Sequence, residues 1–264
     1  MGDWPEGVGR EVFARLDSTN AEALRRAAAG ARGPVWLLAL EQTAARGRRG
    51  RPWASLPGNF AASLLMRPPG SPALAALRSF VAALGLHDAL LAATGRAELF
   101  ALKWPNDVLL AGRKLAGILL ETGGRPEAPA LAIGIGVNLA AAPAAAEVEP
   151  GATEPVDLLS GAGVSIAPEA FLDLLAPAVA HWERRLMQEG FAPLRAAWLA
   201  RAARLGETVT ARLPGREIGG RFETIDESGA LVLVTPQGRV SLPAAEIQFG
   251  HDPSAGEAPH AARH

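Results

Sequence analysis

Residues 46–51 read Arg-Gly-Arg-Arg-Gly-Arg, a run that cannot be packed into the interior as a helix or a strand. Each guanidinium stays charged and is costly to bury without a partner. The two glycines weaken any regular element, and they let the backbone reach positive φ and lie close to a ligand. The run therefore predicts a mobile loop whose arginines bind an anion, although a solvated charge run or a nucleic-acid patch would have the same composition.

The composition of the whole chain makes this arginine run a local feature. The 264 residues carry a formal net charge of −1, whereas general DNA or RNA binders usually present a basic face. The absence of cysteine excludes disulfides, thiolate nucleophiles and cysteine-ligated zinc, and the five histidines show no metal-ligand spacing. The polar N-terminus has no signal-peptide core, and no apolar run reaches roughly 18 residues without a charge or a helix breaker. We therefore expect a cytoplasmic protein with no membrane partner.

Apolar periodicity and turn signals divide most of the chain into strands and helices. Strands are expected at 35–40, 60–66, 99–103, 108–110, 114–121 and 130–137. Helices are expected at 20–30, 71–95, from 168 onward and from 190 to near 206. Thr19 with Glu22 fits a capping box for the first helix. The Ala/Pro/Gly-rich residues 140–165 predict a surface loop.

The last part of the chain has a different pattern, with short strands separated by turn dipeptides. Strands are expected at 208–212, 219–225, 231–234, 239–242 and 247–249, which predicts a small barrel. We therefore divide the chain into a catalytic domain at 1–204, a small β domain at 205–250 and a polar, disordered tail at 251–264.

A second run, Lys103-Trp104-Pro105-Asn106-Asp107, follows a predicted strand. Pro105 holds Trp104 extended and ends the ladder, so Asn106 and Asp107 are expected at the mouth of that strand. A carboxylate there can position a metal-bound phosphate or accept a proton from an amine. An Asx-turn between strands is the structural alternative.

Three further segments carry polar residues beside glycines. Lys114 precedes an apolar strand that contains Gly117, so it is either a solvated edge residue or a point charge on a carboxylate–phosphate transition state. Residues 134–138, Gly-Ile-Gly-Val-Asn, lack the third glycine and the helix of a dinucleotide-binding fingerprint. Residues 18–20, Ser-Thr-Asn, could simply cap a helix.

Together and in this order, these segments resemble the catalytic core of biotin–protein ligases, which attach biotin to carboxylases. The matching segments are 17–20, 41–42, the arginine loop, 103–107, 112–121 and 134–138, and residues 219–234 are similar to the SH3-like C-terminal domain of that family. The resemblance extends from about residue 10 to residue 250. It implies an α+β fold of the class II synthetase-like type, in which helices flank a mixed β-sheet and a small C-terminal SH3-like barrel follows.

The resemblance also implies a two-step reaction. The biotin carboxylate attacks the α-phosphate of ATP to give biotinyl-5′-AMP and pyrophosphate. A lysine of a biotin carboxyl carrier protein then attacks the mixed anhydride and releases AMP. Clustered cations fit this chemistry, because they offset the repulsion between a carboxylate and a triphosphate.

The resemblance also implies roles for the residues of this chain that match the family's motifs by position. Lys114, Arg48 and Asp107 would be catalytic, with Lys114 between the biotin carboxylate and the α-phosphate, and Asp107 assisting Mg²⁺ or the incoming lysine. Biotin would contact Ser18, Thr19, Asn20, Gln42, Arg46, Gly47, Lys114, Gly117, Gly134 and Gly136. ATP or the adenylate would contact Arg48, Arg49, Arg51, Trp53, Asn106, Lys114 and Asn138, with Trp53 helping to form the adenine wall. The closed loop would shield the adenylate from water.

Two departures from the family pattern bear on function. Ala45 replaces the first glycine of the loop, which stiffens the loop but leaves the anion-binding residues intact. No winged helix precedes residue 10, so we expect a monofunctional ligase that does not bind DNA. The oligomeric state stays open, a homodimer included. The rival of the same fold is a lipoate or octanoate–protein ligase, and a nucleic-acid module is the rival of a different class.

Overall fold

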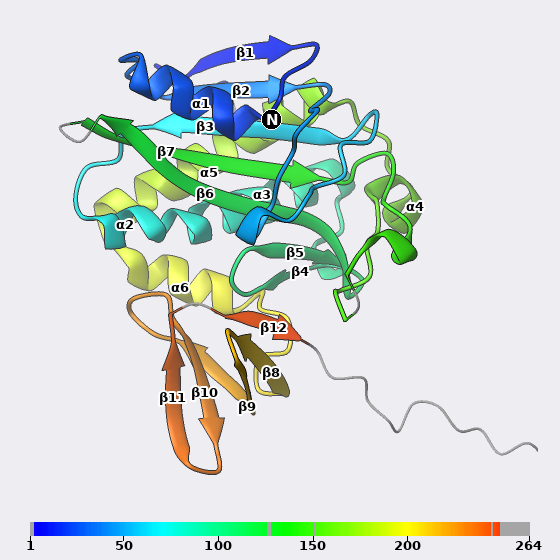
Figure 1. The fold of residues 1–264 in the computed structure, drawn as a ribbon, viewed down its shortest axis with the longest axis vertical. Helices are drawn as coiled ribbons and strands as arrows, with labels where there is room; N and C mark the ends of the chain where they lie inside the picture. The colour runs from blue at the N-terminus through cyan, green and yellow to red at the C-terminus, as the bar shows by residue number, and fades with distance from the viewer. Residues whose placement is uncertain (1–2, 126–127, 150, 244, 249–264) are drawn as a thin grey trace, which may run out of the picture.

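A computed structural model of the chain describes residues 3–125, 128–149, 151–243 and 245–248, and its larger sheet has seven strands in the order β1-β2-β3-β7-β6-β5-β4. Strands β1 and β2 are parallel and all other neighbours are antiparallel, so the sheet is mixed. The strand bounds are β1 Gly9–Phe13, β2 Val35–Ala39, β3 Phe60–Met66, β4 Phe100–Lys103, β5 Asp107–Leu110, β6 Arg113–Arg125 and β7 Ala128–Val137. Figure 1 shows helices on both faces of this sheet.

Helices cover both faces of the larger sheet. On one face, α1 packs against β3, β6 and β7 through Ala23 and Ala27, whose small side chains bring the helix close to the strands. On the other face, α3 and α5 cover a larger core (Figure 1). The helix bounds are α1 Thr19–Ala28, α2 Pro72–Ala76, α3 Arg78–Thr94, α4 Leu158–Ala162, α5 Pro168–Glu189 and α6 Phe191–Leu199.

The segment Pro72–Thr94 is long and apolar enough to cross a membrane by length and composition alone, with a mean hydropathy of 1.5. In the structure 67% of this apolar window is buried, and α3 packs against α5 and the sheet. The hydropathy of this segment therefore matches the role of a core helix.

The second sheet has five antiparallel strands in the order β11-β10-β9-β8-β12. Their bounds are β8 Thr208–Leu213, β9 Arg216–Ile225, β10 Leu231–Thr235, β11 Gly238–Leu242 and β12 Glu246–Gln248. The buried side chains of this sheet, Phe222 and Leu233 among them, continue the larger core, and α6 packs against β9. At the junction, the indole Nε1 of Trp104 donates to the carbonyl oxygen of Gly229 at 3.0 Å. The chain is therefore α+β, with a small antiparallel β domain packed on the larger one.

Several local expectations are wrong or incomplete. The cap of α1 is Ser18 and not Thr19, because the Ser18 hydroxyl accepts the amide N–H of Ala21. The predicted loop at 140–165 contains α4, and α6 ends at Leu199, before the expected stop near Gly206. Strand β1 was not predicted, since its residues are mostly exposed and lack apolar alternation. The predicted disordered tail at 251–264 lies outside the described residues, and the domain boundary after residue 204 stays a prediction.

Candidate functional site

One cavity of about 470 Å³ lies between the seven-stranded sheet, the arginine loop and β12. Its volume falls within the range of small-molecule sites, about 300–1,000 Å³. Every site residue singled out from the sequence lines it: Ser18, Thr19, Asn20, Gln42, Arg46, Gly47, Arg48, Arg49, Arg51, Trp53, Asn106, Asp107, Lys114, Gly117, Gly134, Gly136 and Asn138. The structure brings these residues together from distant parts of the chain, and the role of each stays a prediction.

One end of the cavity is polar and uncharged. It is formed by residues 18–20 at the start of α1, all of them buried, and by Gln42 just after β2. The Oε1 atom of Gln42 accepts the backbone N–H of Thr19 at 2.8 Å, which ties the helix start to the neighbouring strand.

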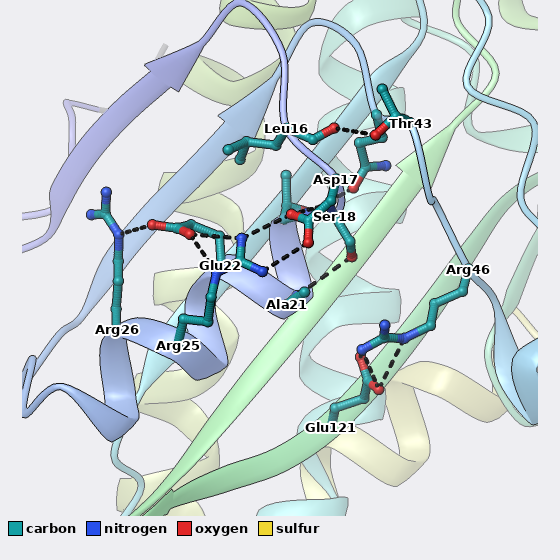
Figure 2. A network of polar contacts seen from close by, with 12 residues as sticks. Leu16, Asp17, Ser18, Ala21, Glu22, Arg25, Arg26, Thr43, Arg46 and Glu121 are labelled. Atoms are coloured by element: carbon teal, nitrogen blue, oxygen red, sulfur yellow. Dashed lines mark hydrogen bonds and ion pairs between the residues drawn. The ribbon is translucent and has the colours of Figure 1, made fainter.

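An ion-pair network outside the cavity fixes this turn. Figure 2 shows Asp17 accepting from both terminal nitrogens of Arg25 while it also accepts the backbone N–H of Ser18. The hydrogen bonds from Arg25 hold the pKa of the Asp17 carboxyl at about 2, well below its ordinary value. Glu22 pairs with Arg25 and Arg26 in the same network and is not part of a capping box.

Paired glycines form the floor of the cavity. Gly117 of β6 lies opposite Gly136 of β7, and the indole of Trp53 lies over both. A Cβ atom would meet the Trp53 ring at 3.2 Å from Gly117 and at 2.8 Å from Gly136. Gly134 leaves space for a different side chain, because a Cβ atom there would lie 2.5 Å from Oδ1 of Asn20. The two strands are glycine-rich here because an aromatic ring and an amide lie directly on their backbones.

The β5–β6 hairpin presents a lysine and a carboxylate to the cavity. Its turn residues Ala111 and Gly112 have φ values of 49° and 78°, as a two-residue hairpin of this twist requires. The hairpin places Nζ of Lys114 2.9 Å from Oδ1 of Asp107 and 5.8 Å from the ring centroid of Trp53. Oδ1 of Asp107 also lies 3.7 Å from the position that a Cβ of Gly117 would take, so this ion pair borders the glycine floor.

The arginine loop closes one side of the cavity through a short 3₁₀ turn at Arg48–Gly50. Three of its arginines pair with carboxylates: Arg46 with Glu121 at 3.1 Å, Arg49 with Glu246 at 3.3 Å, and Arg51 with Glu246 at 2.8 Å and Glu149 at 2.9 Å. Glu246 belongs to β12, so the small β domain holds this loop. The mobility expected of the loop stays a prediction.

The remaining arginine of the loop, Arg48, is directed toward the second motif. It donates to the side-chain oxygen of Asn106 at 3.2 Å, and burial lowers the pKa of its guanidinium. Burial also lowers the pKa of Lys103, which is 8% exposed and donates to the Thr153 hydroxyl at 2.6 Å. Desolvated cations interact more strongly with an anion than solvated ones do, so this end of the cavity suits a polyphosphate.

Asn138 contributes a buried acceptor to the same cavity. Its Nδ2 donates to the carbonyl oxygen of Val156 at 3.1 Å. Its Oδ1 is buried and has no hydrogen-bond partner within the part of the chain that the structure describes. Such an atom is costly unless a ligand or water satisfies it, which points to a bound group with a donor at this position.

Several residues of the site were missed from the sequence. Ser63, Glu149, Thr153 and Glu246 contact the predicted residues but lie far from them in sequence. No local pattern marks them, since a single Ser or Glu in a strand or loop is common. Only the pairing of strands and the packing of the β domain bring them to the cavity.

Known proteins resemble both parts of this chain. Residues 12–138 match the model of the biotin/lipoate A/B protein ligase family, and residues 205–250 match the biotin protein ligase C-terminal domain. A biotin–[acetyl-CoA-carboxylase] ligase of Paracoccus denitrificans is 58% identical over 240 residues, which cover 90% of this chain and 100% of the relative. The Mycobacterium tuberculosis protein of the same name is 36% identical over 249 residues, covering 90% and 87%.

A solved structure supports the fold. The biotin protein ligase of Aquifex aeolicus in complex with biotin and ATP superposes with a TM-score of 0.77 at 24% identity, covering 91% of this chain and 97% of the other. The structural match concerns the fold, and the matches along the sequence establish the family. The chain is a member of the biotin/lipoate A/B protein ligase family and carries the C-terminal domain of biotin protein ligases.

Proposed function

We propose that this chain is a biotin–protein ligase that activates biotin with ATP and transfers it to a lysine of a biotin carboxyl carrier protein. The observation that carries this proposal is a single cavity with a neutral polar end, a glycine floor and a cationic end. The neutral end matches the ureido group of biotin, the Trp53 indole that covers the glycine floor suits its apolar chain, and the cationic end suits the triphosphate. The 58% identity to a biotin–[acetyl-CoA-carboxylase] ligase supports the same reaction.

In the first step, an oxygen of the biotin carboxylate attacks the α-phosphorus of ATP, and the bond to the pyrophosphate oxygen breaks. Lys114 pairs with Asp107 beside the floor, and Arg48 of the arginine loop lines the same cavity and donates to Asn106. Both offset the charge that accumulates as two anions meet. The adenylate is then held by Asn138, whose buried Oδ1 accepts a donor from it, with Trp53 at its edge.

In the second step, the neutral amine of the carrier lysine attacks the carbonyl carbon of the mixed anhydride. The bond to the phosphate oxygen breaks, AMP leaves, and the amine proton must be taken up. Asp107 is the carboxylate in position to accept it, because Oδ1 lies at the floor beside Lys114. The loop arginines hold the nucleotide and exclude water from the anhydride.

We expect ATP to bind together with Mg²⁺. Within the described ranges there is no cluster of three acidic, histidine or cysteine side chains that could form a metal site. Magnesium usually needs only one or two carboxylates in addition to phosphate and water oxygens. Asp107 fits this need, because its buried Oδ1 lies at the cavity, where it is paired with the ammonium group of Lys114 at 2.9 Å. When bound, the ion would neutralise phosphate charge.

The polar end of the cavity favours biotin over lipoate. Ser18, Thr19 and Gln42 offer hydrogen-bonding groups at its closed end, which a ureido ring can satisfy. The dithiolane ring of lipoate has no N–H or carbonyl, so it would leave these groups unpaired at a cost of about 1–3 kcal/mol each.

Pyrophosphate release tests the function directly. The purified chain is incubated with ATP, Mg²⁺ and either biotin or lipoate, and transfer to a carrier domain is followed by mass spectrometry. We expect pyrophosphate and a biotinylated carrier with biotin alone. Activity with lipoate and none with biotin would overturn the proposal. Since the reaction uses ATP, we place it in the cytoplasm.

A further inference from the structure

Ser63 is a buried hydroxyl behind the polar end of the cavity. It lies on β3 opposite Gly134 of β7, and Gly134 lies opposite Leu119 of β6. Ser63 is 0% exposed and does not line the cavity, so it can affect a ligand only through its neighbours. Those neighbours are Thr19 and Asn20.

The amide of Asn20 has one possible orientation. Its Nδ2 lies 3.3 Å from the carbonyl oxygen of Leu119 and 2.8 Å from Oε2 of Glu121, and its Oδ1 lies 2.6 Å from Oγ of Ser63. Carbonyl and carboxylate oxygens only accept hydrogen bonds, so the NH₂ group must face β6 and the oxygen must face Ser63. The single proton of Ser63 is therefore committed to Asn20.

Counting donors and acceptors in the same way determines which group receives the hydroxyl proton of Thr19. Oγ of Ser63 also lies 2.7 Å from Oγ1 of Thr19, and two oxygens at this distance repel unless a proton lies between them. Since Ser63 has none left, Thr19 must supply it. Oε1 of Gln42, 3.2 Å from Oγ1 of Thr19, is meanwhile satisfied by the backbone N–H of Thr19. The Thr19 oxygen then keeps a lone pair for the cavity.

We propose that Ser63 and Glu121 are positioning residues, which orient the Thr19 hydroxyl as the acceptor for a ureido N–H. This inference rests on the proposed function. The acceptor oxygen of Thr19 lies beside the side-chain amide of Gln42, and this pair matches the adjacent N–H and carbonyl of a ureido ring. A ring without an N–H, such as a dithiolane, cannot donate to Thr19. Glu121 also pairs with Arg46 (Figure 2), so one carboxylate orders both the polar end and the start of the arginine loop.

A double-mutant cycle tests this arrangement, with biotin affinity measured by calorimetry on the full chain. Ser63→Ala and Thr19→Val should each weaken biotin binding about tenfold, as expected for a hydrogen bond in a buried site. The double variant should bind about as weakly as Thr19→Val alone, because Ser63 acts only through Thr19. Additive losses would overturn the inference.

A second readout separates positioning from stability. The wild-type chain should strongly prefer biotin over an analogue methylated on both ureido nitrogens, and Ser63→Ala should reduce that preference by freeing the Thr19 proton. Glu121→Gln keeps an acceptor for Asn20 and should retain the preference. If Ser63→Ala does not fold, Ser63→Cys offers a weak donor of similar size and should show an intermediate preference. An unchanged preference in the folded Ser63 variant would refute the proposal.

Ser71→Ala is the matched control. Ser71 caps α2, outside the cavity, so its loss should lower the melting temperature and leave biotin affinity unchanged. A Ser71→Ala variant with the binding defect of Ser63→Ala would attribute that defect to stability and overturn the inference. Failure of the wild-type chain to bind biotin at all would refute the proposed function instead.

Discussion

The glycine floor gives a graded prediction about substrate binding. A Cβ at Gly136 would meet the body of the Trp53 ring, with Cε2 at 2.8 Å and Nε1 at 2.9 Å, whereas a Cβ at Gly117 would meet Cζ3 at 3.2 Å. Both glycines lie in paired strands, so neither backbone can move away without breaking the ladder. The ring must therefore rise into the cavity, by more in Gly136→Ala than in Gly117→Ala.

The size of the effect follows from overpacking. An extra carbon in a filled space usually costs about 1–3 kcal/mol, which corresponds to a loss in affinity of about fivefold to 150-fold if binding must restore the ring position. We expect Gly136→Ala to fall in the upper part of this range and Gly117→Ala in the lower part, for biotin and for ATP. Calorimetry gives the affinities and pyrophosphate release gives the rates.

The control is Gly219→Ala on β9, a strand glycine with nothing within 4 Å of its would-be Cβ. It should change neither affinity. Equal effects for Gly136→Ala and Gly219→Ala, or a larger effect for Gly117→Ala than for Gly136→Ala, would refute the role of the floor.

Three further predictions concern charge. Lys114→Ala should slow ATP–pyrophosphate exchange about 10²–10³-fold, as the loss of one preorganised donor does elsewhere; near-normal exchange would remove Lys114 from the mechanism. Arg48→Gly should release biotinyl-AMP into solution and label lysines of bystander proteins, which mass spectrometry detects; full retention of the adenylate would contradict its role. The pKa of Asp17 is held at about 2, so its stabilising contact with Arg25 is complete above the ordinary aspartate pKa and is lost as the pH falls toward 2. Carbon-detected NMR titration should show Asp17 still ionised at pH 3, and a midpoint near 3.8 would refute the contact.

The predictable part of the site comes from segments whose local chemistry is unusual. An arginine–glycine run cannot be buried in the core, and a proline after a strand restricts the backbone conformation of the residue before it. Both motifs could therefore be identified from the sequence alone. The strand at Phe60–Met66 and the hairpin turn at Ala111-Gly112 followed from continuous apolar runs and a turn signal.

The unpredictable part depends on partners that meet only in the folded chain. Ser63 is ordinary in sequence, and its importance arises from the register that sets it opposite Gly134. Glu246 is one acidic residue in a short strand, yet it pairs with two arginines about 200 residues earlier in the chain. Strand β1 was missed because an exposed edge strand needs no apolar face, only the ladder that Leu37 and its neighbours provide.

Because Glu246 pairs with Arg49 and Arg51, neither fragment of a chain cut between the two domains would contain the complete wall of the cavity. Cleavage between α6 and β8 would leave Arg49 and Arg51 on one fragment and Glu246 on the other. Biotinylation by a mixture of the two fragments would then depend on how often the fragments associate. If each fragment were fused to a different protein, biotinylation would report whether those two proteins lie close together.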